Sequence, residues 1–176
     1  MKKLQFPRDE QAHKTIVEWW YWNGHLIDQA GNRFAFMTCL FGVDPTRVKL
    51  AFFKIPSRRA YFSHSLLVDL RRKKNYQDVQ YLSLVAADSF SRDLLFVNYI
   101  DANVLEGFKV SVVEETAPFE YRLKGNNFDL TLAAVKKPLL EGGEGYLAMD
   151  GRRTYYYSLT NLRTEGFVTI DGKSDI

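Results

Sequence analysis

The sequence contains little that would tie the chain together covalently or carry it through a membrane. Cys39 is the only cysteine among 176 residues, so no disulfide forms within the chain and the core must hold the fold. No run approaches the roughly 20 apolar residues that span a bilayer as a helix. Lys2 and Lys3 are not followed by an apolar segment, so we expect no signal peptide in this chain. A longer parent protein is free to carry one, and localisation stays open.

Charge of one sign is also scarce. The formal net charge is only +3 at pH 7, which does not indicate a nucleic-acid binder. The one basic concentration, 71–74 with the pair 58–59, adjoins expected strands. We interpret it as solvated loop rather than a contact for phosphate or an anionic membrane. The Gly-rich segment 141–145 lacks the Lys-Ser/Thr of a phosphate loop, and we interpret it as a mobile turn or a rim loop.

Metal-ligating and nucleophilic side chains are few. His13, His25 and His64 are the only histidines. They form no His-x-His or Cys/His cluster, so the sequence predicts no metal site and no cofactor. Cys39 lies inside the apolar run 34–41, and we interpret it as a buried small hydrophobe.

Aromatic residues, in contrast, are abundant. They make up 15% of the chain, with 13 Phe, 10 Tyr and 3 Trp. Such residues favour strands and carry large apolar area. Segment after segment also alternates with period two. We therefore predict a single all-β domain over residues 1–176, an antiparallel barrel or closely curled sheet of roughly nine strands.

Turn-forming residues separate the expected strands. In the clearest hairpin, alternating residues 119–124 and 128–132 flank the turn Gly125-Asn126-Asn127. The run 33–41 is apolar at both alternating sets, which predicts a strand covered on both faces. The other expected strands are 18–27, 48–53, 60–69, 79–85, 108–113, 154–161 and 167–170, with a short helix or irregular stretch around 89–99.

The C-terminal residues suggest an interrupted hairpin. Asp171-Gly172 is a usual opening of a hairpin turn, and only four residues follow, ending at Ile176. We expect that the partner strand is missing. Either the final residues are loose, or the chain is a fragment of a longer protein.

The string 18–22, Glu-Trp-Trp-Tyr-Trp, is the most unusual feature of the chain. Period two puts Glu18, Trp20 and Trp22 on one face of a strand and Trp19 and Tyr21 on the other. The rings provide either an aromatic wall for an extended apolar ligand or an ordinary core strand. We predict that the Trp20 and Trp22 face lines a cavity.

Two acidic residues are candidates for catalysis, Glu18 and Asp69. Apolar neighbours would raise the pKa of a buried Glu18 and make it a proton donor. A structural ion pair, with Arg33 across the hairpin, is favoured instead. Asp69 could act with His64 as an acid–base pair, although a spacing of five puts them on opposite faces of a straight strand.

The run Tyr155-Tyr156-Tyr157 supplies further polar groups. Tyr155 and Tyr157 share one face and Tyr156 lies on the other. One set packs in the core and the other hydrogen-bonds the polar end of a ligand, and the sequence does not decide which. The candidate ligand-binding residues are therefore Trp20, Trp22, His64, Tyr156 and Tyr157.

Two stretches carry a family resemblance. The first joins 6–10 (Phe-Pro-Arg-Asp-Glu), His13 and 18–26 (Glu-Trp-Trp-Tyr-Trp-Asn-Gly-His-Leu), and the second joins 137–146 to 155–162. Together they resemble the N-terminal half of the hydroxyneurosporene synthase family, the carotenoid 1,2-hydratases, with the related AttH-like proteins. The resemblance covers nearly the whole chain. His64 and Asp69 also stand where this family tends to place a His and an Asp.

The resemblance implies a lipocalin-like domain that is the N-terminal half of a two-domain protein. It implies a hydrophobic, isoprenoid or polyene-like ligand and, in the full-length protein, hydration of a double bond. The family's proton-donating acid follows a Trp-(Met/Phe)-Asp-His-x-Trp motif that would begin after this chain ends. No catalytic residue is therefore carried over, and we expect the chain alone to be inactive.

Two alternative hypotheses stay open beside this interpretation. In the first, the chain is a complete small enzyme with Glu18 or Asp69 as its acid. In the second, it is a non-catalytic lipophilic-ligand carrier or interaction domain. If the chain lacks a C-terminal lipocalin-like partner domain, we expect an exposed apolar docking face and self-association through it.

Overall fold

A computed structural model describes residues 3–47, 59–88, 94–103, 107–125, 128–170 and 173–175, and most of them belong to strands. The principal strands are β1 (Val17–Ile27), β2 (Arg33–Val43), β3 (Ala60–Asp69), β4 (Lys74–Asp88), β5 (Phe96–Asn103), β6 (Gly107–Ala117), β7 (Glu120–Lys124), β8 (Phe128–Ala134), β13 (Leu162–Ile170) and β14 (Lys173–Asp175). They form one ten-stranded sheet in the order β1-β2-β3-β4-β5-β6-β7-β8-β13-β14. Every pairing in it is antiparallel. The prediction of an all-β antiparallel fold is confirmed.

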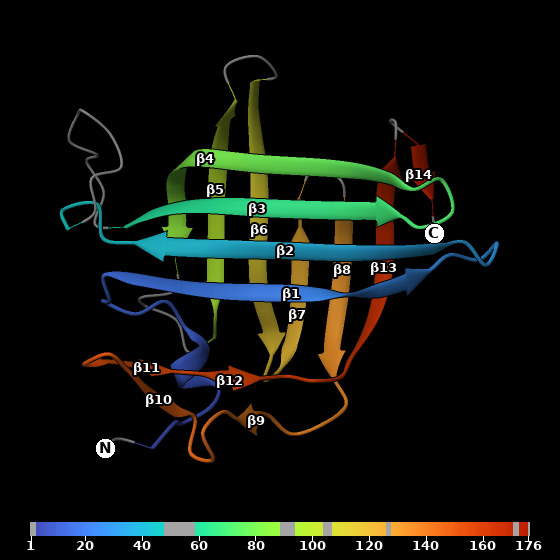
Figure 1. Cartoon of the computed structure of the whole chain (residues 1–176). Coiled ribbons are helices and arrows are strands. Elements are labelled where there is room, and N and C mark those ends of the chain that lie inside the picture. The colour runs from blue at the N-terminus through green and yellow to red at the C-terminus, as the bar shows by residue number, and fades with distance from the viewer. Residues whose placement is uncertain are drawn as a thin grey trace.

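The sheet curls so that its two halves face each other. Figure 1 shows β1–β3 running across the view in front of β5–β8 and β13, which run nearly at right angles behind them. β4 bends from one layer to the other, and its ladder with β5 shifts register between Val85 and Ala87. Such an irregularity increases local twist and lets a strand turn a corner. Among the described residues β1 and β14 are the edges and no ladder joins them, so the sheet is closely curled but not a closed barrel.

Apolar side chains from both layers fill the space between them. The buried cluster includes Trp22, Leu26, Phe34, Phe36 and Leu40 from the front layer and Val113, Tyr121, Leu123, Leu130, Leu132, Val168 and Ile170 from the back. Burying one large apolar side chain contributes about 1.5–3 kcal/mol. The period-two alternation of each strand places these residues on the inward face.

Short elements gather at one end of the curled sheet. They are the 3-10 turn η1 (Arg8–Glu10) and the pairs β9 (Leu139–Leu140) with β12 (Tyr157–Ser158) and β10 (Tyr146–Met149) with β11 (Arg152–Tyr155). In Figure 1 they lie together below β1, on the side of the N-terminus. The N-terminal segment therefore meets residues 139–158 there. In the described part of the chain no helix is long and apolar enough to cross a membrane.

Most of the expected strands form. The segments 18–27, 33–41, 60–69, 79–85, 108–113, 128–132 and 167–170 fall within β1, β2, β3, β4, β6, β8 and β13. The expected hairpin around residue 125 is also present as β7 and β8, with Tyr121 opposite Leu132. The expected strand 48–53 lies outside the described residues.

Three expectations about local structure are wrong. Residues 154–161 do not form one strand, because β11 ends at Tyr155 and β12 begins at Tyr157. Residues 96–99 belong to β5 rather than to a helix or irregular stretch, while 89–93 lie outside the described residues. The C-terminal hairpin has a short partner strand, since Lys173 of β14 pairs with Ile170 of β13.

Gly166 is a position in β13 that only glycine fits. Its φ angle is 141°, and a Cβ there would lie 2.1 Å from the carbonyl oxygen of Asp129. It pairs with Leu130 of β8. The absence of a side chain allows β13 to approach β8 closely enough to continue the sheet.

Candidate functional site

The two tryptophans expected to face inward do so. Trp22 is 6% exposed, and Trp20 packs against the core cluster from its margin. On the opposite face of β1, Trp19 is 46% and Tyr21 is 41% exposed. The ring of Trp22 meets that of Tyr121 edge to face, with centroids 5.8 Å apart. The predicted orientation of this strand is confirmed, whereas a ligand on its inner face stays a prediction.

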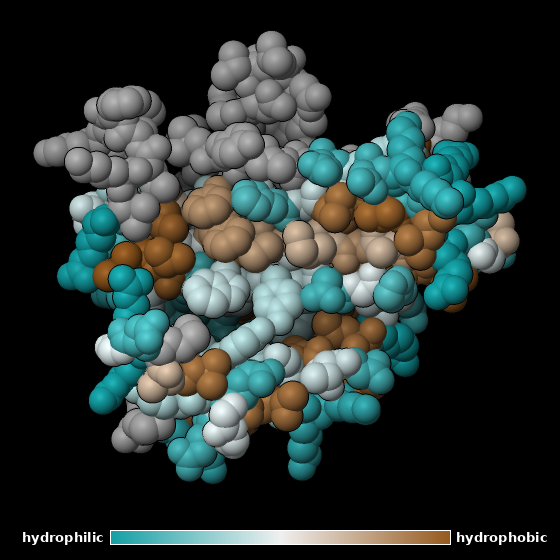
Figure 2. All heavy atoms as spheres, in the orientation of Figure 1, coloured by the Kyte–Doolittle hydropathy of each residue, from teal (hydrophilic) through white to brown (hydrophobic). Residues whose placement is uncertain are grey.

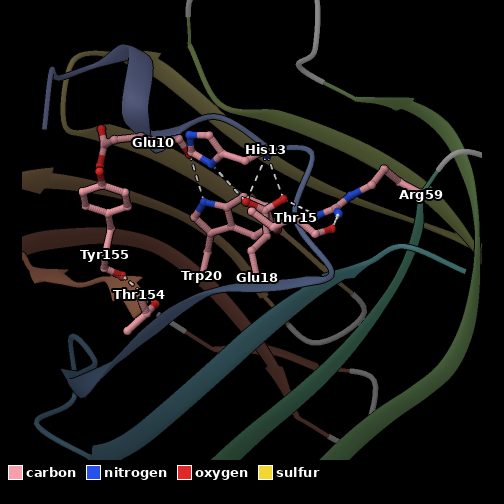
Figure 3. Close-up of polar contacts among 8 residues, drawn as sticks. All are labelled: Glu10, His13, Thr15, Glu18, Trp20, Arg59, Thr154 and Tyr155. Atoms are coloured by element: carbon pink, nitrogen blue, oxygen red, sulfur yellow. Dashed lines mark hydrogen bonds and ion pairs between the residues drawn. The ribbon is translucent and has the colours of Figure 1, made fainter. Parts of the chain in front are cut away.

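Glu10 is a buried acidic group in contact with Trp20 and Tyr121. It ends η1 and is only 2% exposed. Its Oε1 accepts hydrogen bonds from the hydroxyls of Tyr121, at 2.7 Å, and Tyr157, at 2.8 Å. The indole Nε1 of Trp20 donates to the Glu10 carbonyl oxygen at 2.9 Å (Figure 3). The N-terminal segment is thus joined to β1, β7 and β12 through one residue.

The electrostatic environment of Glu10 favours its neutral form. Its pKa is raised to about 8, chiefly by burial and next by the nearby Glu115 side chain. Its Oε2 is also buried and makes no hydrogen bond of normal geometry to the described residues. Glu10 is therefore mostly a carboxylic acid at pH 7, with a proton available for donation.

Glu115 is a second buried acid, on β6, and is 2% exposed. Its Oε2 accepts from the backbone N–H of Leu95 at 3.1 Å, and its Oε1 accepts from that of Phe119 at 3.0 Å. Both carboxyl oxygens of Glu115 are thus held by backbone N–H groups.

The two tyrosines beside Glu10 remain hydroxyl donors at all ordinary pH values. Burial raises the pKa of Tyr121 and of Tyr157 well above the usual value, and the neighbouring Glu10 raises both further. The ring of Tyr157 also packs edge to face on Phe6, with centroids 4.8 Å apart. The cluster of Glu10, Glu115, Tyr121, Tyr157, Trp20 and Trp22 is called the buried-acid cluster below.

Glu18, at the start of β1, forms a structural ion pair. Its carboxylate pairs with the guanidinium of Arg59, which is 3% exposed. It also accepts from the backbone N–H of His13 at 2.8 Å (Figure 3). Arg59 in turn donates to the carbonyl oxygen of Thr15 at 2.6 Å. The prediction that Glu18 pairs with Arg33 is wrong, because the register of the hairpin places Arg33 opposite Ile27, at the other end of the hairpin.

Asp69 holds the turn that follows β3. Its Oδ1 accepts from the backbone N–H groups of Arg71, at 2.9 Å, and Arg72, at 2.8 Å. Asp69 is 5% exposed and faces inward, whereas His64 packs outward against Phe41, with ring centroids 5.5 Å apart. The two residues lie on opposite faces, as their spacing predicts, and form no acid–base pair.

The consecutive tyrosines do not share one strand. Tyr156 interrupts the pairing, and its hydroxyl forms a hydrogen bond of 2.9 Å with that of Tyr21 on the outer face of β1. Tyr157 instead contacts Glu10. Tyr155 is 49% exposed, so the expectation that it shares a face with Tyr157 is wrong. Of the candidate ligand-binding residues, the structure brings Trp20, Trp22 and Tyr157 together and leaves Tyr156 and His64 elsewhere.

An apolar hollow lies in the sheet away from the tryptophans. It is lined by residues that include Phe36, Leu67, Tyr76, Phe128 and Val168, and it measures about 310 Å³ with its open mouth. Its enclosed part has room for about one water molecule.

Metal and thiol chemistry receive no support from the described residues. No group of three or more His, Cys, Asp or Glu side chains in that part of the chain is arranged to hold a metal. Burial raises the pKa of the Cys39 thiol to about 11, which disfavours the nucleophilic thiolate.

An all-β chain whose curled antiparallel sheet encloses an aromatic core is typical of lipocalin-like proteins. Residues 1–175 match the AttH-like family, and the chain belongs to that family. The AttH-like part of the resemblance is confirmed. No curated protein matches the chain.

Two solved structures share the fold. A putative AttH from Nitrosomonas europaea has 22% identity and a TM-score of 0.72, and the match covers 99% of this chain and 52% of that one. Kievitone hydratase from Nectria haematococca has 14% identity and a TM-score of 0.64, with 98% and 47% covered. The chain therefore spans about half the length of both proteins, one of which is a hydratase.

Proposed function

We propose that this domain binds a hydrophobic, isoprenoid or polyene-like small molecule and supports hydration of a double bond by a longer, hydroxyneurosporene synthase-type protein. The observation that carries the proposal is Glu10, a carboxylic acid whose pKa of about 8 keeps it protonated among aromatic rings. Hydration of an alkene begins with a proton from such an acid. The hydratase among the structures of the same fold supports the same class of reaction.

The atoms of this reaction balance without a cofactor. The acid transfers its proton to one alkene carbon, water adds its oxygen to the other, and a proton leaves that water and restores the acid. The developing carbocation would be stabilised by indole and phenol faces. Trp20 and Tyr121 provide such rings beside Glu10, and Trp22 packs on Tyr121.

Access to Glu10 requires a change from the closed arrangement. The acid is 2% exposed, and η1 and Tyr157 lie against it. A ligand reaches it only when the N-terminal segment or β12 moves aside. The isolated domain is therefore a binding domain, and turnover belongs to the longer protein.

Binding is tested with a fluorescent polyene fatty acid titrated into the chain. We expect saturable quenching of tryptophan emission. The affinity for the polyene should be retained in Trp19→Phe and weakened several-fold in Trp22→Phe. The two variants make the same chemical change on opposite faces of β1. Absence of saturable quenching in the wild-type chain would refute ligand binding.

The second candidate function is that of a carrier without catalytic activity, which the burial of Glu10 favours. The two candidate functions are distinguished with a full-length protein that contains this domain, incubated with a carotenoid that has an isolated terminal double bond. Glu10→Gln abolishes water addition while polyene binding persists if the domain supports hydration. Unchanged turnover in that variant overturns the role of Glu10.

A further inference from the structure

The outer face of the front layer is apolar, and several of its large side chains are exposed in the part of the chain that the structure describes. On β1–β3 the outward positions carry Trp19 and Tyr21, then Met37 and Phe41, then Phe62, His64 and Leu66, and these seven residues are called the outer face below. Trp19, Tyr21 and Met37 are 46%, 41% and 39% exposed. Figure 2 shows hydrophobic residues gathered in a band across β2 and β3 in this view. β2 is apolar on both faces, which is typical of a strand covered on both sides, yet Met37 on its outer face is 39% exposed.

The rings on the outer face are already arranged as a flat surface. Phe41 and Phe62 stack with centroids 4.7 Å apart and planes 9° from parallel. His64 packs on the Phe41 ring. Register aligns Trp19 with Phe41 on β2, and Phe41 with Phe62 on β3. Exposed aromatic residues and methionine are the types enriched at the centres of protein interfaces.

The charge of this face permits contact with a copy of itself. The outward positions of β1, β2 and β3 carry no Asp, Glu or Lys, and Arg33 is the only arginine, at the end of the hairpin. An isologous contact places each side chain opposite a residue of the same patch. A patch with many like charges would repel its copy, and this one does not.

A second copy of this chain presents the same neutral, aromatic surface, so the two outer faces match in chemistry. We propose that the outer face is the interface of a homodimer, in which β1–β3 of one chain lie against β1–β3 of a second copy.

The size of the face determines how strong this dimer is. Strands are spaced about 4.8 Å apart and rise about 3.4 Å per residue, so three strands of this length cover roughly 500 Å². Two such faces bury roughly 1,000 Å², at the lower limit of specific interfaces. The dimer therefore dissociates on dilution.

Sedimentation equilibrium of the whole chain over a range from about 1 to about 500 μM tests the proposal. We expect a monomer–dimer equilibrium in the wild type and at least a tenfold rise of its dissociation constant in Trp19→Glu and in Met37→Glu. Phe167→Glu is the matched control, because Phe167 is also an exposed apolar residue, 59% exposed, but lies on β13. It should leave the equilibrium unchanged.

The fold of each variant is checked by its circular dichroism and thermal midpoint. Two substitutions on different strands keep the test decisive if one of them unfolds the chain. A wild-type chain that is monomeric at the highest concentration overturns the proposal, and such a face would then belong to a different partner. A dimer that persists in both folded outer-face variants overturns it as well.

Discussion

Replacing Glu10 with glutamine should remove a large pH dependence of stability. The amide keeps an oxygen that accepts from Tyr121 and Tyr157, which approach to 2.7 and 2.8 Å. Its amide group does not ionise, so it can lie beside Glu115 at any pH. The variant therefore keeps the contacts of the neutral acid and loses its titration.

The magnitude follows from the shift in the pKa of Glu10 from 4.5 to about 8. The folded state keeps the proton longer than the unfolded state, so the wild-type chain loses stability as pH rises from 4.5 to about 8 and levels off above that. With about 1.4 kcal/mol for each pKa unit, the loss between pH 5 and pH 7 is about 2–3 kcal/mol. The whole loss, from well below pH 4.5 to above pH 8, is about 5 kcal/mol.

The assay is urea unfolding of both chains at half-unit steps from pH 5 to pH 8.5. The free energy of unfolding of Glu10→Gln minus that of the wild type should grow by about 2–3 kcal/mol between pH 5 and 7, because all other titrations are common to both chains. The exposed Glu144 provides the control substitution Glu144→Gln, for which the difference should stay flat. A flat difference for Glu10→Gln as well would refute a buried, neutral acid at this position.

Three further substitutions test separate contacts. Tyr157→Phe removes one hydroxyl donor to Glu10 and should lower the free energy of unfolding by about 1 kcal/mol in urea; no change would mean that the hydrogen bond contributes nothing. Arg59→Met leaves the half-buried Glu18 without its cation and should cost about 3–5 kcal/mol by the same assay, whereas a loss below about 1 kcal/mol would contradict a structural ion pair. Gly166→Ala places a methyl group against the neighbouring backbone and should lower the thermal midpoint by several degrees, by about 2–4 °C per kcal/mol lost in a domain of this size. An unchanged midpoint would contradict the close approach of β13 to β8.

The strands were predictable because their signal is local. Alternation along β1 and β2 identifies the hairpin and the inward face that carries Trp22. The same alternation locates β7 and β8. Period two is read within a few residues, and tertiary contacts did not override it in these segments.

The buried-acid cluster was not predictable because its members are far apart in sequence. Glu10 lies 111 residues from Tyr121 and 147 from Tyr157. Only the curl of the sheet brings them together. The one available signal was Glu115, an acid at an inward position two residues after the buried Val113, where charge is costly unless paired.

Local reasoning also failed where the true partner lies far away in the sequence. Arg33 is the only cation on β2, but the register places it at the other end of the hairpin from Glu18. Arg59, which precedes β3, pairs with Glu18 instead. The alternation of the tyrosine run predicts one strand, but the backbone N–H of Tyr156 donates to the Gly145 carbonyl oxygen at 3.0 Å. That bond to another loop interrupts the strand at Tyr156.

The most direct test of the central claim is a titration of the Glu10 carboxyl by carbon NMR. The resonance is assigned in a chain with labelled glutamate side-chain carboxyls, as the signal that disappears in Glu10→Gln. We predict a midpoint near pH 8, as expected for an acid held neutral by burial beside Glu115. A midpoint close to 4.5, the ordinary value, would show an ionised carboxylate at pH 7 and contradict the proposed proton source.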